Sequence, residues 1–336
     1  AVDGTIGLNT HGTGNATVVN DAGLQFASST VGGNLHATST TGNMTQSGAL
    51  DIEGTTTLIT SADDATINLG TSSNAFTGAL LITTNDSGTD TAGDVSIHGG
   101  TTALVLGNST IDGDLTLTST ATSTTGISDT GTLDIRGTTT ISASGVDITL
   151  NSAANNFQGA VGIDGADVIL VDAGTIDLGA STVTGTYNLT AGGSVTGSGA
   201  LAITGVTTID ASSGNVTLNT ATNNFQGAVE IDGVNVVVVD AGAIDLGAST
   251  VSGTYAVTAT AGGNITDSGV LAITAAATFT AASGQSIYLD SANTFSNTVT
   301  FSSGGTLANV TISDSNDFDL AALTLSGNLN TTSTGG

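Results

Sequence analysis

The side chains of this sequence that could do chemistry are mostly aspartates, and several stand in close pairs. Three pairs stand out: Asp63 with Asp64, Asp112 with Asp114, and Asp317 with Asp319. Residues i and i+2 of a strand share one face, and hard carboxylate oxygens suit Ca²⁺, so these pairs are candidate calcium ligands. Aspartate also closes turns by bonding its own backbone. We therefore interpret most aspartates as solvated turn residues and keep weak Ca²⁺ binding as an alternative.

The three histidines, His11, His36 and His98, are the other candidate metal ligands. No cysteine accompanies them, and no HExxH or His-x-His spacing places two of them on one face. We interpret them as surface residues of turns or strands. A G-x-S-x-G elbow, which would expose a nucleophilic serine, is absent too. The sequence thus predicts no catalytic residue, no metal site and no bound cofactor, and we expect a protein that is not an enzyme.

Carbohydrate-active proteins are the main alternative to a purely structural role. Polysaccharide lyases and glycosidases need clustered carboxylates, often with Ca²⁺ and a basic residue that stabilises developing charge. Arg136 is the single strong base in 336 residues, which argues against a lyase that acts on an acidic polymer. The alternative that stays open is a carbohydrate-binding or carbohydrate-cleaving β-helix with a carboxylate-lined lateral face.

The net charge of the chain excludes two classes of partner. The formal charge is −27, from 26 Asp and two Glu against Arg136. A phosphate-binding surface requires clustered Lys and Arg, and an anionic membrane repels such a chain, so we expect no nucleic acid partner. No run of about 18 apolar residues is present, so we predict no membrane insertion.

The elements that carry these residues must be built from small side chains. Charged residues make up 9% and aromatic residues 3% of the chain, and Pro, Cys, Trp and Lys are absent. The 48 glycines allow frequent turns. Because Pro cannot donate to a strand ladder, its absence fits a chain made of stacked strands.

Internal repeats dominate the sequence. The heptapeptide NNFQGAV occurs at 155–161 and again at 223–229, which is 68 positions later. Related Asn-x-Phe elements place Phe76, Phe157, Phe225 and Phe295 in register. We predict one β-solenoid over residues 1–336, with repeats at about 18–86, 87–167, 168–235 and 236–305 and a partial repeat at 306–336.

Within a repeat, short apolar–polar alternations end at Gly, Asn, Asp or Ser, which is typical of strands and turns. Three strands occupy about 20 residues, so we predict an all-β, right-handed parallel β-helix with three short strands per coil. The NNFQG segment is predicted to lengthen one coil, and its Phe is predicted to cap the core at a corner or to cover an exposed edge. The Thr runs at 55–57 and 138–140 occur once per repeat, too rarely for an ice-binding face.

The phrases VTLNTATNNFQGAV (216–229), VDAGAIDLGAST (239–250) and AGGSVTGSGAL (191–201) support a resemblance. They resemble repeats of large bacterial surface proteins of the filamentous-haemagglutinin and autotransporter-adhesin kind. The resemblance implies a right-handed β-helix, export to the bacterial cell surface, and adhesive or structural work. We therefore expect a rigid, acidic, extracellular filament subunit or adhesin stalk. Its expected partners are other copies bound end to end, flanking parts of a longer chain, or a surface glycan.

Overall fold

The computed structural model describes residues 3–71, 73–85, 87–88, 92–317 and 319–334. These residues form β-strands and no helix, so they contain no helix that could cross a membrane. The strands pair in parallel as a β-solenoid of about 15 turns with about 21 residues per turn. The predicted all-β parallel β-helix is thereby confirmed. The chain divides into two compact units, Ala1–Ala173 and Gly174–Gly336, and its continuity as a single solenoid stays a prediction.

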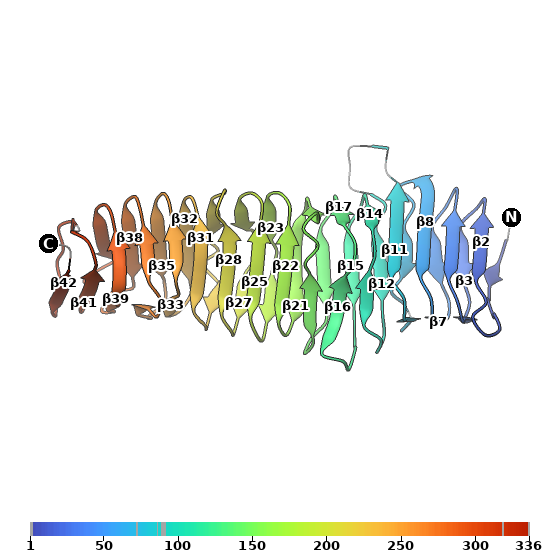
Figure 1. Cartoon of the computed structure of the whole chain (residues 1–336), viewed down its shortest axis with the longest axis horizontal. Coiled ribbons are helices and arrows are strands. Elements are labelled where there is room, and N and C mark those ends of the chain that lie inside the picture. Colours follow the sequence, from blue (N-terminus) through green and yellow to red (C-terminus); the bar gives the residue numbers. More distant parts are fainter. Residues whose placement is uncertain (1–2, 72, 86, 89–91, 318, 335–336) are drawn as a thin grey trace. The chain divides into compact units, whose positions relative to one another are not determined.

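Figure 1 shows the strands of successive turns side by side. In each turn of the first unit, one side consists of a single strand and the other of two consecutive strands, and we call them the straight side and the bent side. Up to residue 85, the straight side holds β2 (Ala16–Asn20), β5 (Leu35–Ser39), β8 (Thr56–Asp63) and β11 (Leu80–Asn85). The bent side holds β1 (Thr5–Ile6), β3 (Leu24–Phe26), β6 (Met44–Gln46) and β9 (Ile67–Leu69), followed around the corner by β4 (Ser29–Val31), β7 (Leu50–Ile52) and β10 (Ala75–Phe76).

The two sides then exchange places. The single strand β12 (Val95–His98) pairs with β9, whereas β13 (Leu104–Leu106) and β14 (Ser109–Ile111) both pair with the straight strand β11. The exchanged pattern continues in straight strands β15 (Leu115–Thr118), β18 (Thr139–Ser142) and β21 (Ala160–Gly165) and in bent pairs β16 (Thr125–Asp129) with β17 (Leu133–Ile135) and β19 (Asp147–Leu150) with β20 (Asn156–Phe157). A second exchange begins at β22 (Val168–Asp172), which pairs with β19.

The second unit follows the same plan. Its first bent pairs are β23 (Ile176–Leu178) with β24 (Ser181–Val183), β26 (Val195–Gly197) with β27 (Leu201–Ile203), and β29 (Val216–Leu218) with β30 (Asn224–Phe225). The matching straight strands are β25 (Tyr187–Ala191), β28 (Thr207–Ala211) and β31 (Val229–Gly233).

After β31 the sides of this unit exchange as well. The straight strand β32 (Val236–Asp240) pairs with β29, whereas β33 (Ile244–Leu246) and β34 (Ser249–Val251) both pair with β31. Straight strands β35 (Tyr255–Ala259), β38 (Ala277–Ala281) and β40 (Val299–Ser303) follow, beside bent strands β36 (Ile265–Asp267) and β37 (Leu271–Ile273). The long strand β39 (Ile287–Phe295) pairs with both bent strands, and β41 (Val310–Asp314) and β42 (Leu329–Ser333) continue from it.

The Asn-x-Phe element always stands at the end of the last bent side before an exchange. Phe76, Phe157, Phe225 and Phe295 are at most 2% exposed, so these rings belong to the core. The turn after this element carries its straight strand on the side that was bent in the turn before.

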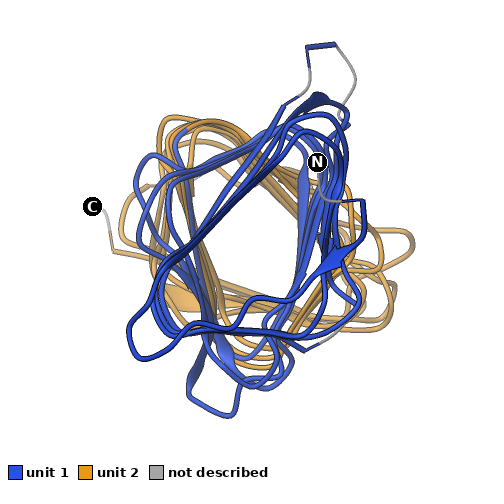
Figure 2. Ribbon diagram, turned by 90° about the vertical axis from the view of Figure 1, so that its right-hand side faces the viewer, with its two compact units in different colours: residues 1–173 blue, residues 174–336 orange. Residues whose placement is uncertain are grey.

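Inward residues fill the space within each turn and stack in register. Leu117, Ile141 and Ile163 form one such column in the first unit, and all three are buried. Figure 2 shows the turns of each unit as closed loops around this core. In the second unit, Phe279 packs edge-to-face on Tyr255, with ring centroids 6.0 Å apart. Burial of apolar surface at roughly 25 cal/mol per Å² is the main stabilising contribution to such a fold.

Glycine is required where successive turns touch at a corner. A Cβ added to Gly205 would lie 2.4 Å from the carbonyl oxygen of Gly185, and one added to Gly227 would lie 2.3 Å from that of Gly205. These distances are far inside van der Waals contact. The column of glycines therefore lets the backbone of one corner rest on the next.

Side chains extend the backbone ladder around other corners. The Oδ1 of Asn215 accepts the N–H of Asn235 at 3.1 Å, and the Oδ1 of Asn235 accepts the N–H of Thr254 at 3.0 Å. Asp94 and Asp114 play the same part in the first unit, where the Oδ1 of Asp114 accepts the N–H of Thr138 at 2.6 Å. Corner N–H groups that lack a strand partner are satisfied in this way.

Candidate functional site

The four points of exchange share a buried asparagine, the first Asn of each Asn-x-Phe element. Its Oδ1 accepts the backbone N–H of a leucine in the preceding turn at 2.8 to 2.9 Å. The asparagines are Asn74, Asn155, Asn223 and Asn293, and the leucines are Leu50, Leu133, Leu201 and Leu271. Each asparagine is at most 2% exposed. An identical bond at every exchange indicates a structural role for this residue.

A buried carboxylate closes three of these exchanges from the following turn. The Oδ2 of Asp240 accepts the backbone N–H of Phe225 at 2.7 Å. In the same way, the Oδ2 of Asp172 accepts the N–H of Phe157 at 2.7 Å, and the Oδ2 of Asp314 accepts the N–H of Phe295 at 3.2 Å. Each of these aspartates is the last residue of a straight strand and is at most 1% exposed. The carboxylate thus accepts the N–H of the Phe in the bent side that lies one turn before its own straight strand. We name these three residues the closing aspartates.

Two further aspartates, Asp129 and Asp267, support the buried asparagines directly. Each is 8% exposed and accepts an asparagine Nδ2 at 2.7 Å, from Asn155 and Asn293 respectively. Asp267 also accepts the backbone N–H of Asp290 at 2.9 Å. The expectation that aspartates are solvated turn residues is wrong for these two and for the closing aspartates. The signal in the sequence is an Asp at the end of an uninterrupted apolar run, as in VILVD (168–172) and VVVVD (236–240).

Burial perturbs two of these carboxyl groups. Desolvation raises the pKa of Asp240, against the opposing effect of hydrogen bonds from the N–H groups of Phe225 and Gly242. Desolvation also raises the pKa of Asp267, although Asn293 and two backbone N–H groups favour its charged form. Removing a carboxylate from water costs more here than a few neutral donors return.

The paired aspartates proposed as calcium ligands have other partners. Asp63 accepts the N–H of Ser87, and this bond lowers the pKa of Asp63. The Oδ1 of Asp112 lies 3.5 Å from Nη1 of Arg136. Asp114 accepts the N–H of Thr138, and Asp319 accepts a hydrogen bond from the hydroxyl of Thr298 at 2.9 Å. Asp317 is exposed. Asp64 adopts a left-handed φ of 59°. Among the residues that the structure describes, no three His, Asp or Glu side chains come together as a metal site.

The histidines lie apart from one another in the first unit. His11 is exposed in a turn, and His36 is exposed on β5, where its Nε2 lies 3.5 Å from Oγ1 of Thr38. His98 is half-buried on β12, and its backbone carbonyl accepts the Nδ2 of the buried Asn74 at 3.1 Å. No shared ligand position follows from this arrangement of the three side chains.

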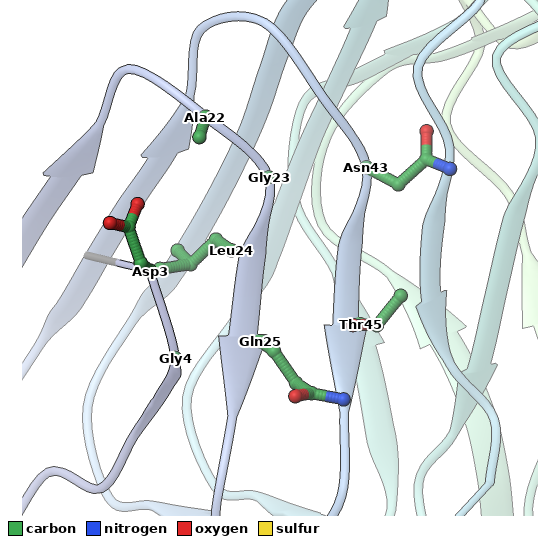
Figure 3. Close-up of a pocket in the computed structure, with 8 residues that line it drawn as sticks. All are labelled: Asp3, Gly4, Ala22, Gly23, Leu24, Gln25, Asn43 and Thr45. Carbon is green, nitrogen blue, oxygen red and sulfur yellow. The ribbon is translucent and has the colours of Figure 1, made fainter. Parts of the chain in front are cut away.

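Shallow polar grooves mark the lateral faces. One, of about 420 Å³, lies beside β1, β3 and β6 and is lined by Asp3, Gly4, Ala22, Gly23, Leu24, Gln25, Asn43 and Thr45 (Figure 3). Another, of about 320 Å³, carries the corner carboxylates Asp94 and Asp114. A third, of about 590 Å³, lies in the second unit against β30 and β33. A ligand could rest on grooves of this kind.

Parallel turns, exchanging sides and buried joints define the class of this protein: it is a β-solenoid repeat protein. The chain belongs to the family described as repeats of unknown function (DUF5649), whose model matches residues 13–83, 92–164, 165–232 and 233–302. Each matched segment contains one Asn-x-Phe element. No curated protein and no solved structure matches the chain.

Proposed function

We propose that this protein is a non-catalytic, extracellular structural segment of a bacterial surface protein. Its repeats resemble those of filamentous-haemagglutinin and autotransporter-adhesin proteins, and this resemblance is the basis for placing it at the cell surface, in adhesion and in biofilm contact. The proposed work is mechanical: the segment holds other parts of a surface structure apart at a fixed spacing. It acts as a filament subunit or as the stalk of an adhesin.

The observation that carries the proposal is the bonding of each turn to the next throughout both units. Parallel strands, corner rungs such as Asn215 to Asn235, and the closing aspartates connect successive turns. In a solenoid each repeat contacts its neighbours, so stiffness depends on the weakest junction between turns. Here the junctions where the sides exchange carry extra buried hydrogen bonds, which favours a spacer that resists bending.

The charge of the chain supports a crowded, extracellular role. At −27 the protein repels other copies and anionic surfaces at long range, which keeps a dense array of such segments separate and solvated. Two forms of the function follow. A filament subunit associates end to end with other copies, whereas a stalk segment is continued by other parts of its own chain.

Electron microscopy at several protein concentrations, with and without Ca²⁺, tests the proposal. Long uniform fibres that lengthen with concentration are expected of a filament subunit. Straight particles of constant length are expected of a stalk segment. Particles that bend freely between turns would contradict a structural spacer of either form, because such a spacer must keep its ends at a constant distance.

A further inference from the structure

The identical heptapeptides occupy two different environments. In the first copy, the Nδ2 of Asn156 and the Nε2 of Gln158 both donate to Oδ1 of Asp134, at 2.8 and 3.1 Å. Asp134 lies on β17, directly beneath Asn156 in the strand register. The polar side chains of Asn156 and Gln158 are thus hydrogen-bonded to the neighbouring strand, and we call this copy closed.

In the second copy the acceptor is missing. Asn224 is paired in register with Ala202, which occupies the place of Asp134 and has no polar side-chain atom. The side chains of Asn224 and Gln226 are both exposed. One difference, Asp against Ala, therefore separates a closed copy from an open copy of the same seven residues.

The open copy lines the groove of about 590 Å³ in the second unit. The groove is lined by Asn224 and Gln226, by Asp245 and Thr266, and by Asn264 and Gln285 from later turns. Its volume of about 590 Å³ lies within the range of about 300 to 1,000 Å³ that is usual for ligand sites.

Two of the residues that line this groove are glycines, Gly262 and Gly263. A Cβ on Gly263 would lie 2.1 Å from the backbone nitrogen of Ala243, and Gly262 has a left-handed φ of 79° that disfavours other residues. The backbone at Gly263 therefore approaches the preceding turn closely, and neither glycine puts a side chain into the groove.

The chemistry of the lining selects among ligand classes. The amides of Asn224, Gln226 and Gln285 can both donate and accept hydrogen bonds, which matches the hydroxyl groups of a sugar. The Oδ1 of Asn264 already accepts the N–H of Ser286 at 2.9 Å. Asp245 adds an acceptor and already receives the hydroxyl of Thr266 at 3.1 Å. No Lys, Arg or His lines the groove, so an anionic ligand finds no counter-charge. Phe225, Ala243 and Ile244 also line the groove, so it offers apolar as well as polar surface to a ligand.

We propose that this groove is a binding site for neutral oligosaccharides, with Asn224, Gln226 and Gln285 as hydrogen-bonding partners. The site goes beyond the structural role, because it gives the lateral face of a spacer a lectin-like contact. Binding at an open, polar groove is expected to be weak, with a Kd of about 1 mM. Cleavage is not part of the proposal, since a glycosidase needs two carboxyl groups at the scissile bond and Asp245 is the one carboxylate here.

Saturation-transfer NMR with the full chain tests the site. The probes are maltotriose, cellotriose and triacetylchitotriose at about 10 mM, tenfold above a millimolar Kd, with trigalacturonate as the anionic control. At least one neutral probe is expected to receive saturation from the protein, and trigalacturonate is expected to receive none. Absence of transfer to all three neutral probes overturns the proposal, as does equal transfer to trigalacturonate.

The two copies of the heptapeptide supply matched variants. Ala202→Asp should give Asn224 and Gln226 the acceptor that closes the first copy, so the affinity for the bound probe should fall at least about tenfold. Gln226→Ala should also weaken binding, whereas Gln158→Ala in the closed copy should leave it unchanged. Unchanged binding by Ala202→Asp would overturn the proposal. So would equal losses for Gln226→Ala and Gln158→Ala, because the sugar would then bind elsewhere.

Discussion

At the scale of the residue, a few buried hydroxyl groups have no hydrogen-bonding partner among the described residues. Thr56, Thr139 and Thr207 are the first residues of straight strands and point into the core, as does the hydroxyl of Tyr187. In β38 the corresponding residue is Ala277, which has no polar side-chain atom. Burying a hydroxyl without a partner costs about 1 to 3 kcal/mol relative to an apolar group.

The first prediction concerns one of these threonines. Thr207→Val keeps the shape of the side chain and removes the hydroxyl, so it should raise the free energy of unfolding by about 1 kcal/mol. The neighbouring Thr208 points outward and its hydroxyl donates to Glu230 at 3.1 Å. Thr208→Val therefore serves as the control variant. Denaturant titrations of both variants measure the effect. A loss of stability in Thr207→Val would mean that its hydroxyl has a partner in solution.

The second prediction concerns the stacked corners. Gly205→Ala should lower the free energy of unfolding by about 2 kcal/mol or more, because its Cβ would meet the carbonyl oxygen of Gly185. Gly304→Ala is the matched control, since no atom lies within 4 Å of a Cβ at that position. Thermal unfolding of the two variants separates steric contact from a general preference for glycine. Equal melting temperatures would contradict the close approach of the corners.

At the scale of the element, the sequence predicts the strands well and the exchange of sides poorly. Segments such as TIDLGA, STVTG and LAITG are strands, as their apolar–polar alternation indicates. The exchange depends on which strand lies one turn below, and that partner is about 21 residues away in the chain. Local patterns carry no record of this register. The burial of the closing aspartates is not predicted for the same reason. Turn chemistry predicts exposure, whereas the fold places each carboxylate beside the N–H of a Phe in the preceding turn.

The third prediction concerns the pH dependence of the exchange at β32. Because the pKa of Asp240 is raised above its unfolded value of 3.8, the folded state takes up a proton first as the pH falls. The titration of Asp240 should therefore make the protein more stable as the pH is lowered from 7 to about 4.5. Asp267 acts in the same direction. The lowered pKa of Asp63 affects stability only at more acidic pH, near and below 3.8.

Melting temperatures of Asp240→Asn at both pH values test this assignment. The variant should show a smaller rise on acidification than the unmodified protein, by a few degrees at most, because it no longer titrates at this point. Asp210→Asn, which changes an exposed carboxylate on β28, should retain the full rise. An undiminished rise in Asp240→Asn would show that the buried carboxylate does not contribute.

At the scale of the whole molecule, self-repulsion opposes folding. Twenty-eight carboxylic residues face one arginine in the sequence, and charge of one sign on a compact chain is destabilising. The apolar composition of the core could be predicted from the sequence, whereas the exclusion of nucleic acid stays a prediction. The position of a ligand groove could not, because it depends on a single register neighbour, Ala202 or Asp134.

The fourth prediction follows from this charge. Raising NaCl from about 10 mM to 1 M shortens the Debye length from about 30 Å to 3 Å, so the melting temperature should rise. CaCl₂ at matched ionic strength serves as the comparison. An equal rise means general screening, whereas a clearly larger rise with Ca²⁺ would support specific binding at the aspartate pairs. A fall with NaCl would contradict the role of self-repulsion.

The exchange of straight and bent sides has a consequence for how such proteins change during evolution. Repeats that share a stretch as similar as NNFQGAV are prone to unequal recombination, which removes or adds one copy at a time. Each copy ends in one exchange of sides. Adding or removing an odd number of copies would therefore move the straight strand of every later turn to the other side, whereas an even number would leave it on the same side. Copy number therefore decides on which side the straight strand of a later repeat lies, without a change in any residue of that repeat.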